Sequence, residues 1–97
     1  MSAYVVFIRD ETLNDAEMAT YAEKAGKARG DHPINALAFY GALETLEGPE
    51  AEGVVVLEFP SVEAAHAWYD SPEYQAAKEH RLKGAHYRVV LVQGVEK

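Results

Sequence analysis

Three short segments of this chain are apolar at nearly every position, and this pattern limits how it can fold. They are Ala3–Arg9 (AYVVFIR), Val54–Phe59 (VVVLEF) and Tyr87–Gln93 (YRVVLVQ). Their β-branched and aromatic residues favour strands. Alternate residues of a strand point to opposite faces, so Val55 and Leu57 face one side and the neighbouring valines face the other. The sequence therefore predicts a sheet that is apolar on both faces.

The segments between these strands change to helical spacing or to turns. Asn14 predicts the N-cap of a helix that ends near Gly30, and Glu17 stands at the capping-box spacing. Residues 34–47 predict a second strand, because a proline precedes them and they include glycine and aromatic residues. A turn over residues 48–53 would then join this strand to the third one as a hairpin.

A pair of helices is predicted before the last strand. Ser61 is a suitable N-cap for a helix over Val62–Tyr69. Ser71 caps the next helix, with proline at its first position and glutamate beside it. This helix is expected to run to about Lys83, with Gly84 as its C-cap.

The element order is strand, helix, strand, strand, helix pair, strand. This order predicts an α+β fold of the ferredoxin-like βαββαβ type, as one domain over residues 1–97. Right-handed crossovers place the first and third strands in the centre of a four-stranded antiparallel sheet. The helices would cover one face and leave the other, apolar face exposed. We therefore expect a twofold homodimer that packs two sheets face to face.

The charge balance excludes several classes of partner. The chain has 9 Lys and Arg against 16 Asp and Glu, a net charge of −7. This acidic balance disfavours nucleic acids and anionic membrane surfaces. There is no cysteine, no apolar run of about 20 residues, and no signal-peptide pattern in Met1–Asp10. A cytoplasmic location is expected.

The stretch Glu58–Ala77 (EFPSVEAAHAWYDSPEYQAA) resembles the signature of the family called domain of unknown function 1330. Its members carry a similar E-F-P-S, then W-Y, then S-P-E-Y-Q. The resemblance extends from the strand at Tyr4 through Leu46-Glu47-Gly48 to the strand at Val89–Val95. It implies a dimeric α/β barrel of two ferredoxin-like protomers, but no reaction. Proteins on this barrel include cofactor-independent quinol monooxygenases, haem-degrading enzymes, muconolactone isomerase-like enzymes and structural proteins.

Glu58 and His32 are the candidate catalytic residues. Glu58 lies next to the end of an apolar strand, where partial burial would raise the pKa of its carboxyl group and suit a general base. The alternative is a structural role, either in an ion pair, for example with Arg9 or Arg88, or in a hydrogen bond to a helix N-terminus. His32 lies in the loop after the first helix, where functional residues are common. The histidines lack the spacing of a metal site, so neither a metal nor another cofactor is expected.

Aromatic residues with polar tips are candidates for a ligand pocket between the helices and the sheet. Trp68 and Tyr69 diverge by about 100° on a helix, so only one of them can pack on the sheet. Arg81 could bind a carboxylate with two hydrogen bonds if it points inward. The candidate ligand-binding residues are Tyr21, Tyr40, Trp68, Tyr69, Tyr74 and Arg81.

Two functions from different classes remain open at this point. The first is a cofactor-independent enzyme, or a binding protein, for a small aromatic, carbonyl or lactone compound. The second is a non-catalytic structural or stress-related dimeric module that uses the same polar groups for packing. An enzyme keeps convergent polar groups inside a cavity, whereas a structural module fills that space with side chains.

Overall fold

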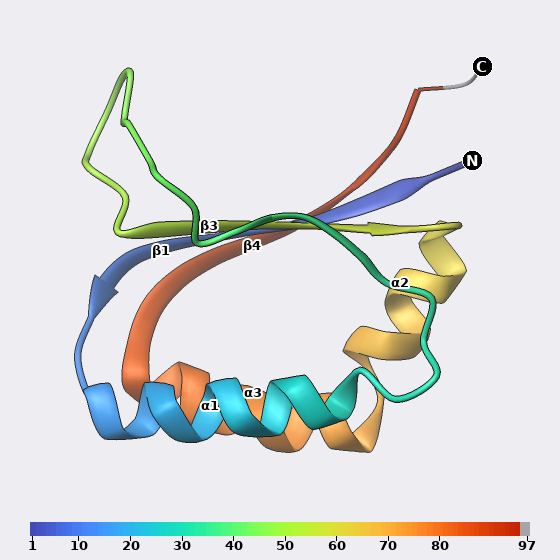
Figure 1. Ribbon diagram of the computed structural model, residues 1–97, viewed down its shortest axis with the longest axis horizontal. Coiled ribbons are helices and arrows are strands. Elements are labelled where there is room, and N and C mark those ends of the chain that lie inside the picture. Colours follow the sequence, from blue (N-terminus) through green and yellow to red (C-terminus); the bar gives the residue numbers. More distant parts are fainter. Residues whose placement is uncertain (96–97) are drawn as a thin grey trace.

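The computed structural model describes residues 1–95 and has a four-stranded antiparallel sheet with helices on one face (Figure 1). The strands are β1 (Ala3–Thr12), β2 (Asn35–Phe39), β3 (Gly53–Phe59) and β4 (Ala85–Gln93), and the helices are α1 (Asp15–Ala28), α2 (Val62–Tyr69) and α3 (Pro72–Gly84). The strand order in space is β2-β3-β1-β4, with β1 and β3 in the centre. The predicted ferredoxin-like βαββαβ fold is confirmed.

Each helix begins at its predicted capping residue. The side chains of Asn14, Ser61 and Ser71 accept hydrogen bonds from the backbone N–H three residues further on, at 3.0–3.2 Å. These bonds satisfy N–H groups that have no partner within the helix. Short local signals therefore fix where the helices start.

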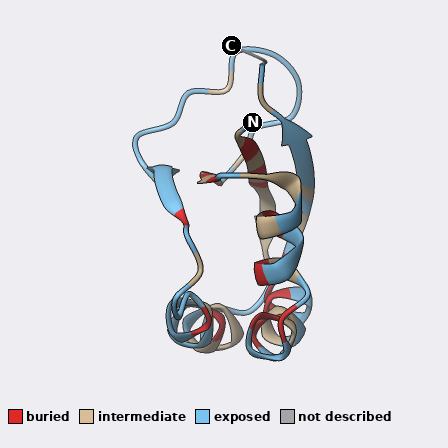
Figure 2. Cartoon of the chain, turned by 90° about the vertical axis from the view of Figure 1, so that its right-hand side faces the viewer, coloured by how far each residue is buried: buried red, intermediate tan, exposed pale blue. Residues whose placement is uncertain are grey.

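Gly84 has a different role from the predicted one. It lies inside α3, and Ala85 is the C-cap in an extended conformation. A Cβ atom at Gly84 would lie only 2.8 Å from the sulfur of Met18 on α1. The Gly84 carbonyl also accepts hydrogen bonds from the backbone N–H of Leu13 and Asn14, at 2.7 and 3.0 Å. Glycine is needed here because α1 passes close to α3, and Figure 2 shows the two helices side by side.

The first and last strands of the chain are longer than predicted. β1 continues past Arg9 to Thr12, and β4 begins at Ala85 instead of Tyr87. The two strands pair over this extra length, with a shift of register between Arg9 and Glu11. Cross-strand hydrogen bonding therefore carries the sheet beyond the apolar segments that predicted it.

β2 ends at Phe39, so the prediction of a strand over residues 34–47 is wrong beyond that point. Tyr40 has φ 51°, in the left-handed region, and this conformation ends the strand. Gly53 makes room for the Tyr40 ring, because a Cβ atom at Gly53 would lie 2.6 Å from it. Residues 41–52 instead form a loop that projects beyond the sheet (Figure 1).

The two faces of the sheet have different surroundings. Val55, Leu57 and Phe59 point toward the helices and are buried. Val54 and Val56 point to the opposite face and are only partly buried. The helices lie on one side of the sheet (Figure 2). The face that they leave uncovered is apolar along β1, β3 and β4, as the strand pattern predicted.

Candidate functional site

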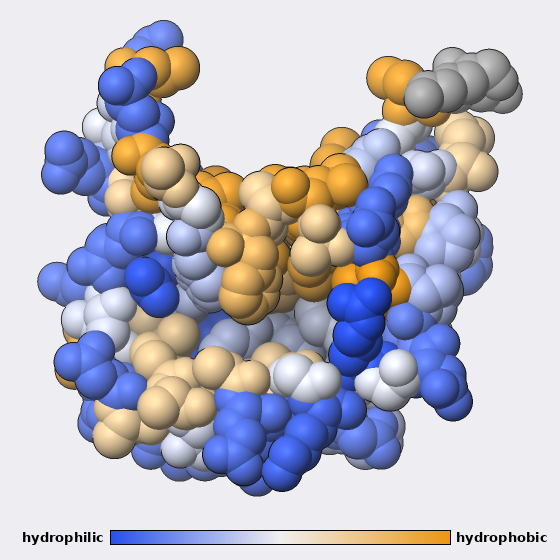
Figure 3. Space-filling view, in the orientation of Figure 1, coloured by the Kyte–Doolittle hydropathy of each residue, from blue (hydrophilic) through white to orange (hydrophobic). Residues whose placement is uncertain are grey.

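A cavity of about 370 Å³ lies between α1 and the sheet. Its walls are mainly apolar, because Phe7, Val55 and Leu57 face it from the sheet. On α1 the facing residues include Ala22 and Gly26, which are too small to fill the space. The face of the molecule that Figure 3 shows is recessed between the sheet and α1. All five residues of β2, which is an edge strand of the sheet, are exposed.

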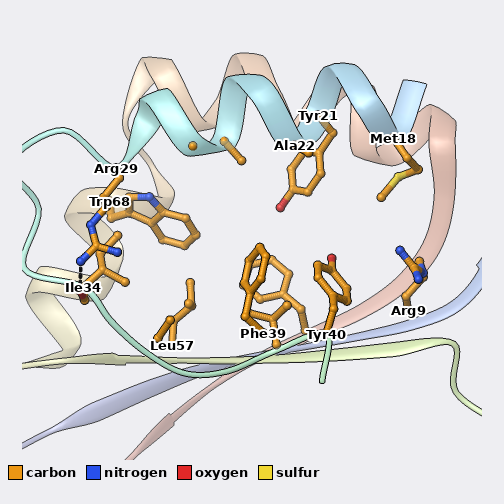
Figure 4. A pocket seen from close by; sticks show the side chains of 15 residues that line it. Arg9, Met18, Tyr21, Ala22, Arg29, Ile34, Phe39, Tyr40, Leu57 and Trp68 are labelled. Carbon is orange, nitrogen blue, oxygen red and sulfur yellow. Dashed lines mark hydrogen bonds between the residues drawn. The ribbon is translucent and has the colours of Figure 1, made fainter. Parts of the chain in front are cut away.

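The charged groups that line the cavity are arginines. Arg29 lies at one end with Trp68, and Arg9 lies at the other end (Figure 4). The Arg29 guanidinium donates a hydrogen bond to the Ile34 carbonyl. The Arg9 guanidinium lies 5.0 Å from the centre of the Tyr40 ring. No carboxylate lines the cavity within residues 1–95, so the cavity is cationic in a chain of net charge −7.

Two pairs of tyrosine hydroxyls meet at this cavity. The hydroxyl oxygens of Tyr21 and Tyr74 lie 2.9 Å apart, and those of Tyr40 and Tyr87 lie 2.6 Å apart. Tyr21 and Tyr40 line the cavity, and their hydroxyls point into it from α1 and from the end of β2 (Figure 4). The other tyrosine of each pair lies behind them, outside the lining.

Three of these tyrosines, Tyr21, Tyr40 and Tyr74, stay protonated at neutral pH. Burial raises the pKa of Tyr21, and the neighbouring Tyr74 raises it further. Burial also raises the pKa of Tyr40, with Tyr87 as the second cause. Burial is likewise the largest cause of the raised pKa of Tyr74. The hydroxyls therefore act as hydrogen-bond donors and acceptors, and not as bases.

Arg81 is a buried cation behind the tyrosines. Its side chain is only 4 % exposed, and its guanidinium stacks 5.2 Å from the Tyr87 ring centre and 5.9 Å from that of Phe7. Its Nε is buried without a hydrogen-bond partner, and Arg81 forms no ion pair within residues 1–95. Its charge acts to lower the pKa values of Tyr21 and Tyr74, against the larger effect of burial.

Trp68 and Tyr69 diverge as predicted. Trp68 is 4 % exposed, packs against Phe7 and Phe59, and lines the cavity. Its indole Nε1 is buried without a hydrogen-bond partner. Tyr69 lies away from the cavity, with its ring 5.3 Å from that of Tyr74.

The two candidate catalytic residues do not line the cavity that holds the two tyrosine pairs. Glu58 and His32 both line a second, open depression of about 410 Å³, next to the cavity at Arg29 and Ile34. The Glu58 carboxylate accepts hydrogen bonds from the Asn35 amide at 3.1 Å and from the Tyr4 hydroxyl at 3.4 Å.

The predicted ion pair of Glu58 with Arg9 or Arg88 is wrong. Arg9 instead lies 3.5 Å from Glu52, and Arg88 forms two 3.0 Å hydrogen bonds with Asp10. Within residues 1–95, no group of three or more His, Asp or Glu side chains is placed to hold a metal ion. The cavity and its tyrosines are therefore the better candidate site.

The sequence patterns missed Arg9, Arg29 and Tyr87. Tyr87 could have been found from the period of two, because it precedes Val89 and Leu91 on the face of β4 that the helices cover. Arg9 follows Val5 and Phe7 at the same period of two, so it could have been found in the same way. Arg29 carries no such signal, because it lies just after the end of α1.

A sequence model of the family described as domain of unknown function (DUF1330) matches residues 2–95. The chain belongs to this family. No protein of curated function matches the sequence of this DUF1330 protein.

Solved structures of other proteins show the same fold. RPA0582 from Rhodopseudomonas palustris, described as a protein of unknown function, matches with a TM-score of 0.74 and 17 % identity, over 99 % of this chain and 84 % of that chain. SnoaB from Streptomyces nogalater, described as a cofactor-independent oxygenase, matches with a TM-score of 0.66 and 10 % identity, over 99 % and 95 % of the two chains.

A third structure adds a description of assembly. A protein of unknown function from Bacteroides fragilis, described as dimeric and ferredoxin-like, matches with a TM-score of 0.59 and 12 % identity, over 96 % of each chain. Identities this low show a shared fold, and the activity or assembly of each relative is its own.

Proposed function

We propose that this DUF1330 protein is a homodimer that binds a small, planar organic molecule in the cavity between α1 and the sheet. The observation that carries the proposal is the cavity itself, which is bounded on one side by the exposed edge strand β2 and is therefore accessible to a ligand. Its volume of about 370 Å³ lies in the usual range of ligand pockets, about 300–1,000 Å³. Apolar walls with a few convergent polar groups are typical of such pockets.

Cofactor-independent chemistry on the bound molecule is part of this proposal. SnoaB, which shares the fold, is described as a cofactor-independent oxygenase. In this chain the groups beside the ligand would be the hydroxyls of Tyr21 and Tyr40, which can donate or accept hydrogen bonds. The alternative, a structural module, would need no ligand in the cavity.

Filling the cavity tests the proposal. Ala25 lines the cavity, and Ala25→Leu would place a larger side chain in that space. A ligand at 100 times its Kd stabilises a protein by about 2.7 kcal/mol. We expect an aromatic acid, phenol or lactone to raise the Tm of the wild type, and to raise that of Ala25→Leu much less.

Ala19→Leu is the matched control, because Ala19 is exposed on the same helix and does not line the cavity. It should keep the full ligand response. An equal response of Ala25→Leu and the wild type would place the ligand elsewhere. No response of the wild type to any of these compounds would favour the structural module.

The uncovered sheet face supports the proposed homodimer. Tyr4, Val6 and Val56 lie on it, and Val90 and Val92 on the same face are about half exposed. Figure 3 shows apolar side chains gathered above the sheet, in the hollow between loop 41–52 and the opposite end of the molecule. An apolar face of this kind is self-complementary across a twofold axis, so a second copy can cover it.

Sedimentation velocity at micromolar concentration tests the dimer. We expect one species of twice the chain mass of 10.7 kDa. A lone species at the chain mass would contradict the proposed assembly without affecting the cavity.

No helix within residues 1–95 is long and apolar enough to cross a membrane. The cytoplasmic location stays a prediction, and fractionation of the cells that make the protein would test it.

A further inference from the structure

We infer that Tyr21 and Tyr40 form an oxyanion-binding site inside the cavity, which takes the ionised oxygen of an aromatic ligand. This inference rests on the proposed binding of a planar molecule in the cavity. It adds the chemical class of the ligand: an aromatic ring that carries a phenolate or a carboxylate.

Each of the two tyrosine pairs has one hydroxyl proton that the contact within the pair does not use. Each tyrosine hydroxyl has one proton to donate. The 2.9 Å contact between Tyr21 and Tyr74 uses one of their two protons, and the 2.6 Å contact between Tyr40 and Tyr87 does the same. One donor is therefore left over in each pair.

The surroundings favour placing both spare protons in the cavity. The positive charge of Arg81 acts on the Tyr74 hydroxyl from behind the cavity. Either hydroxyl can donate across the 2.9 Å contact, and a cation that attracts the lone pairs of the Tyr74 oxygen favours the arrangement in which Tyr74 donates to Tyr21. The Tyr21 proton can then point into the cavity. Tyr40 can donate in the same way when Tyr87 donates to it, and Figure 4 shows both lining hydroxyls directed into the same space.

The charges around the site match an anion. Arg81 lies behind Tyr74 and Tyr87. Arg9, which is paired with Glu52 at 3.5 Å, lies over the Tyr40 ring at one end of the cavity. A buried cation without a partner is costly unless an opposite charge compensates it. Within residues 1–95 no carboxylate lines the cavity or pairs with Arg81, so a ligand anion would supply that charge.

The rest of the cavity suits the ring that carries the anion. Phe7, Phe39 and Leu57 line it with apolar surface. The raised pKa values of Tyr21 and Tyr40 keep both hydroxyls protonated, so they do not compete with the ligand for negative charge. Hydrogen bonds to an ionised acceptor are about twice as strong as those to a neutral one, so the site should discriminate by charge.

The test uses 4-nitrophenol, whose absorption spectrum reports its ionisation. Nitrobenzene, which has the same ring and nitro group but no hydroxyl, is the neutral comparison compound. We expect the pKa of 4-nitrophenol to fall by about one unit or more when it binds, with its proton released to solvent. A shift of one unit equals a tenfold preference for the anion. Nitrobenzene should bind at least tenfold more weakly than the nitrophenolate.

Single-residue variants test whether the two tyrosine hydroxyls cause the pKa shift of 4-nitrophenol. Tyr21→Phe and Tyr40→Phe should each lose most of the shift while binding nitrobenzene like the wild type, which also shows that the cavity remains folded. Tyr69→Phe is the matched control and should keep the full shift, because Tyr69 does not line the cavity. A full shift in both Tyr21→Phe and Tyr40→Phe would overturn the inference.

The remaining outcomes distinguish failure of the oxyanion site from failure of the cavity as a ligand-binding site. Binding of 4-nitrophenol and nitrobenzene with equal affinity and no shift would overturn the oxyanion site and leave the cavity proposal standing. Failure of the wild type to bind either probe, or 4-nitrobenzoate, would overturn both. Tighter binding of 4-nitrobenzoate than of nitrophenolate would support the site and identify the ligand as a carboxylate; the reverse order would identify it as a phenolate.

Discussion

Replacing Val90 and Val92 together by glutamate is expected to convert the proposed dimer into monomers of 10.7 kDa. These valines lie on the uncovered sheet face and are 53 % and 51 % exposed in the single chain, so glutamates there stay hydrated in a monomer. In a face-to-face dimer the two glutamates of each chain would lose water, and the four carboxylates would repel one another. Each unpaired buried charge costs several kcal/mol, which exceeds what most dimers of this size can compensate. Sedimentation velocity measures the change directly.

The matched control is the double variant Leu13→Glu and Leu82→Glu. These leucines are 53 % and 61 % exposed and lie away from the sheet face. They add the same charge at similar exposure, so this variant should remain dimeric. If the valine variant also remains dimeric, the partner does not cover this face. If both variants dissociate, the added charge is the cause and the surface is not.

Replacing Arg81 by methionine is expected to stabilise the fold while it weakens anion binding. Replacing a whole buried ion pair by apolar residues of similar volume is often neutral or stabilises a protein by about 1–4 kcal/mol, and Arg81 has no partner charge to lose in the described part of the chain. Stacking on Tyr87 and Phe7 offsets about 2 kcal/mol or more of the several kcal/mol needed to desolvate a guanidinium, but no ion pair within residues 1–95 offsets the rest. Methionine keeps the apolar stem and fills the same space. Urea unfolding measures the stability, and 4-nitrophenol titration measures the binding.

Lys78→Met provides the matched control on the same helix. The Lys78 ammonium lies 5.3 Å from the Tyr69 ring centre, so this variant removes a stacked cation that is not deeply buried. Its free energy of unfolding should change by about 0.5 kcal/mol or less. A less stable Arg81→Met with intact anion binding would mean that Arg81 is a packing residue.

The helices could be predicted because their signals are local. Asn14, Ser61 and Ser71 each cap the helix that follows through a contact three residues away. The strand order followed from the handedness of crossovers. The end of β2 could not be predicted, because it depends on the left-handed backbone of Tyr40 and its contact with Gly53, which is distant in the sequence.

The candidate site was predicted only in part, for the same reason. Tyr21, Tyr40 and Trp68 line the cavity as expected, whereas Tyr74 and Arg81 lie behind it and Tyr69 lies away from it. The cavity itself has no sequence signal, because it depends on the distance between α1 and the sheet. That spacing is a tertiary property.

The contact between Gly53 and Tyr40 has a consequence for comparing members of the family. Any residue other than glycine at position 53 would collide with the Tyr40 ring, since even a Cβ atom would lie 2.6 Å from it. The two positions are therefore expected to covary. A homologue that pairs a larger residue at 53 with tyrosine at 40 must hold that ring elsewhere, so these two letters of an alignment would separate homologues that can carry this hydroxyl from those that cannot.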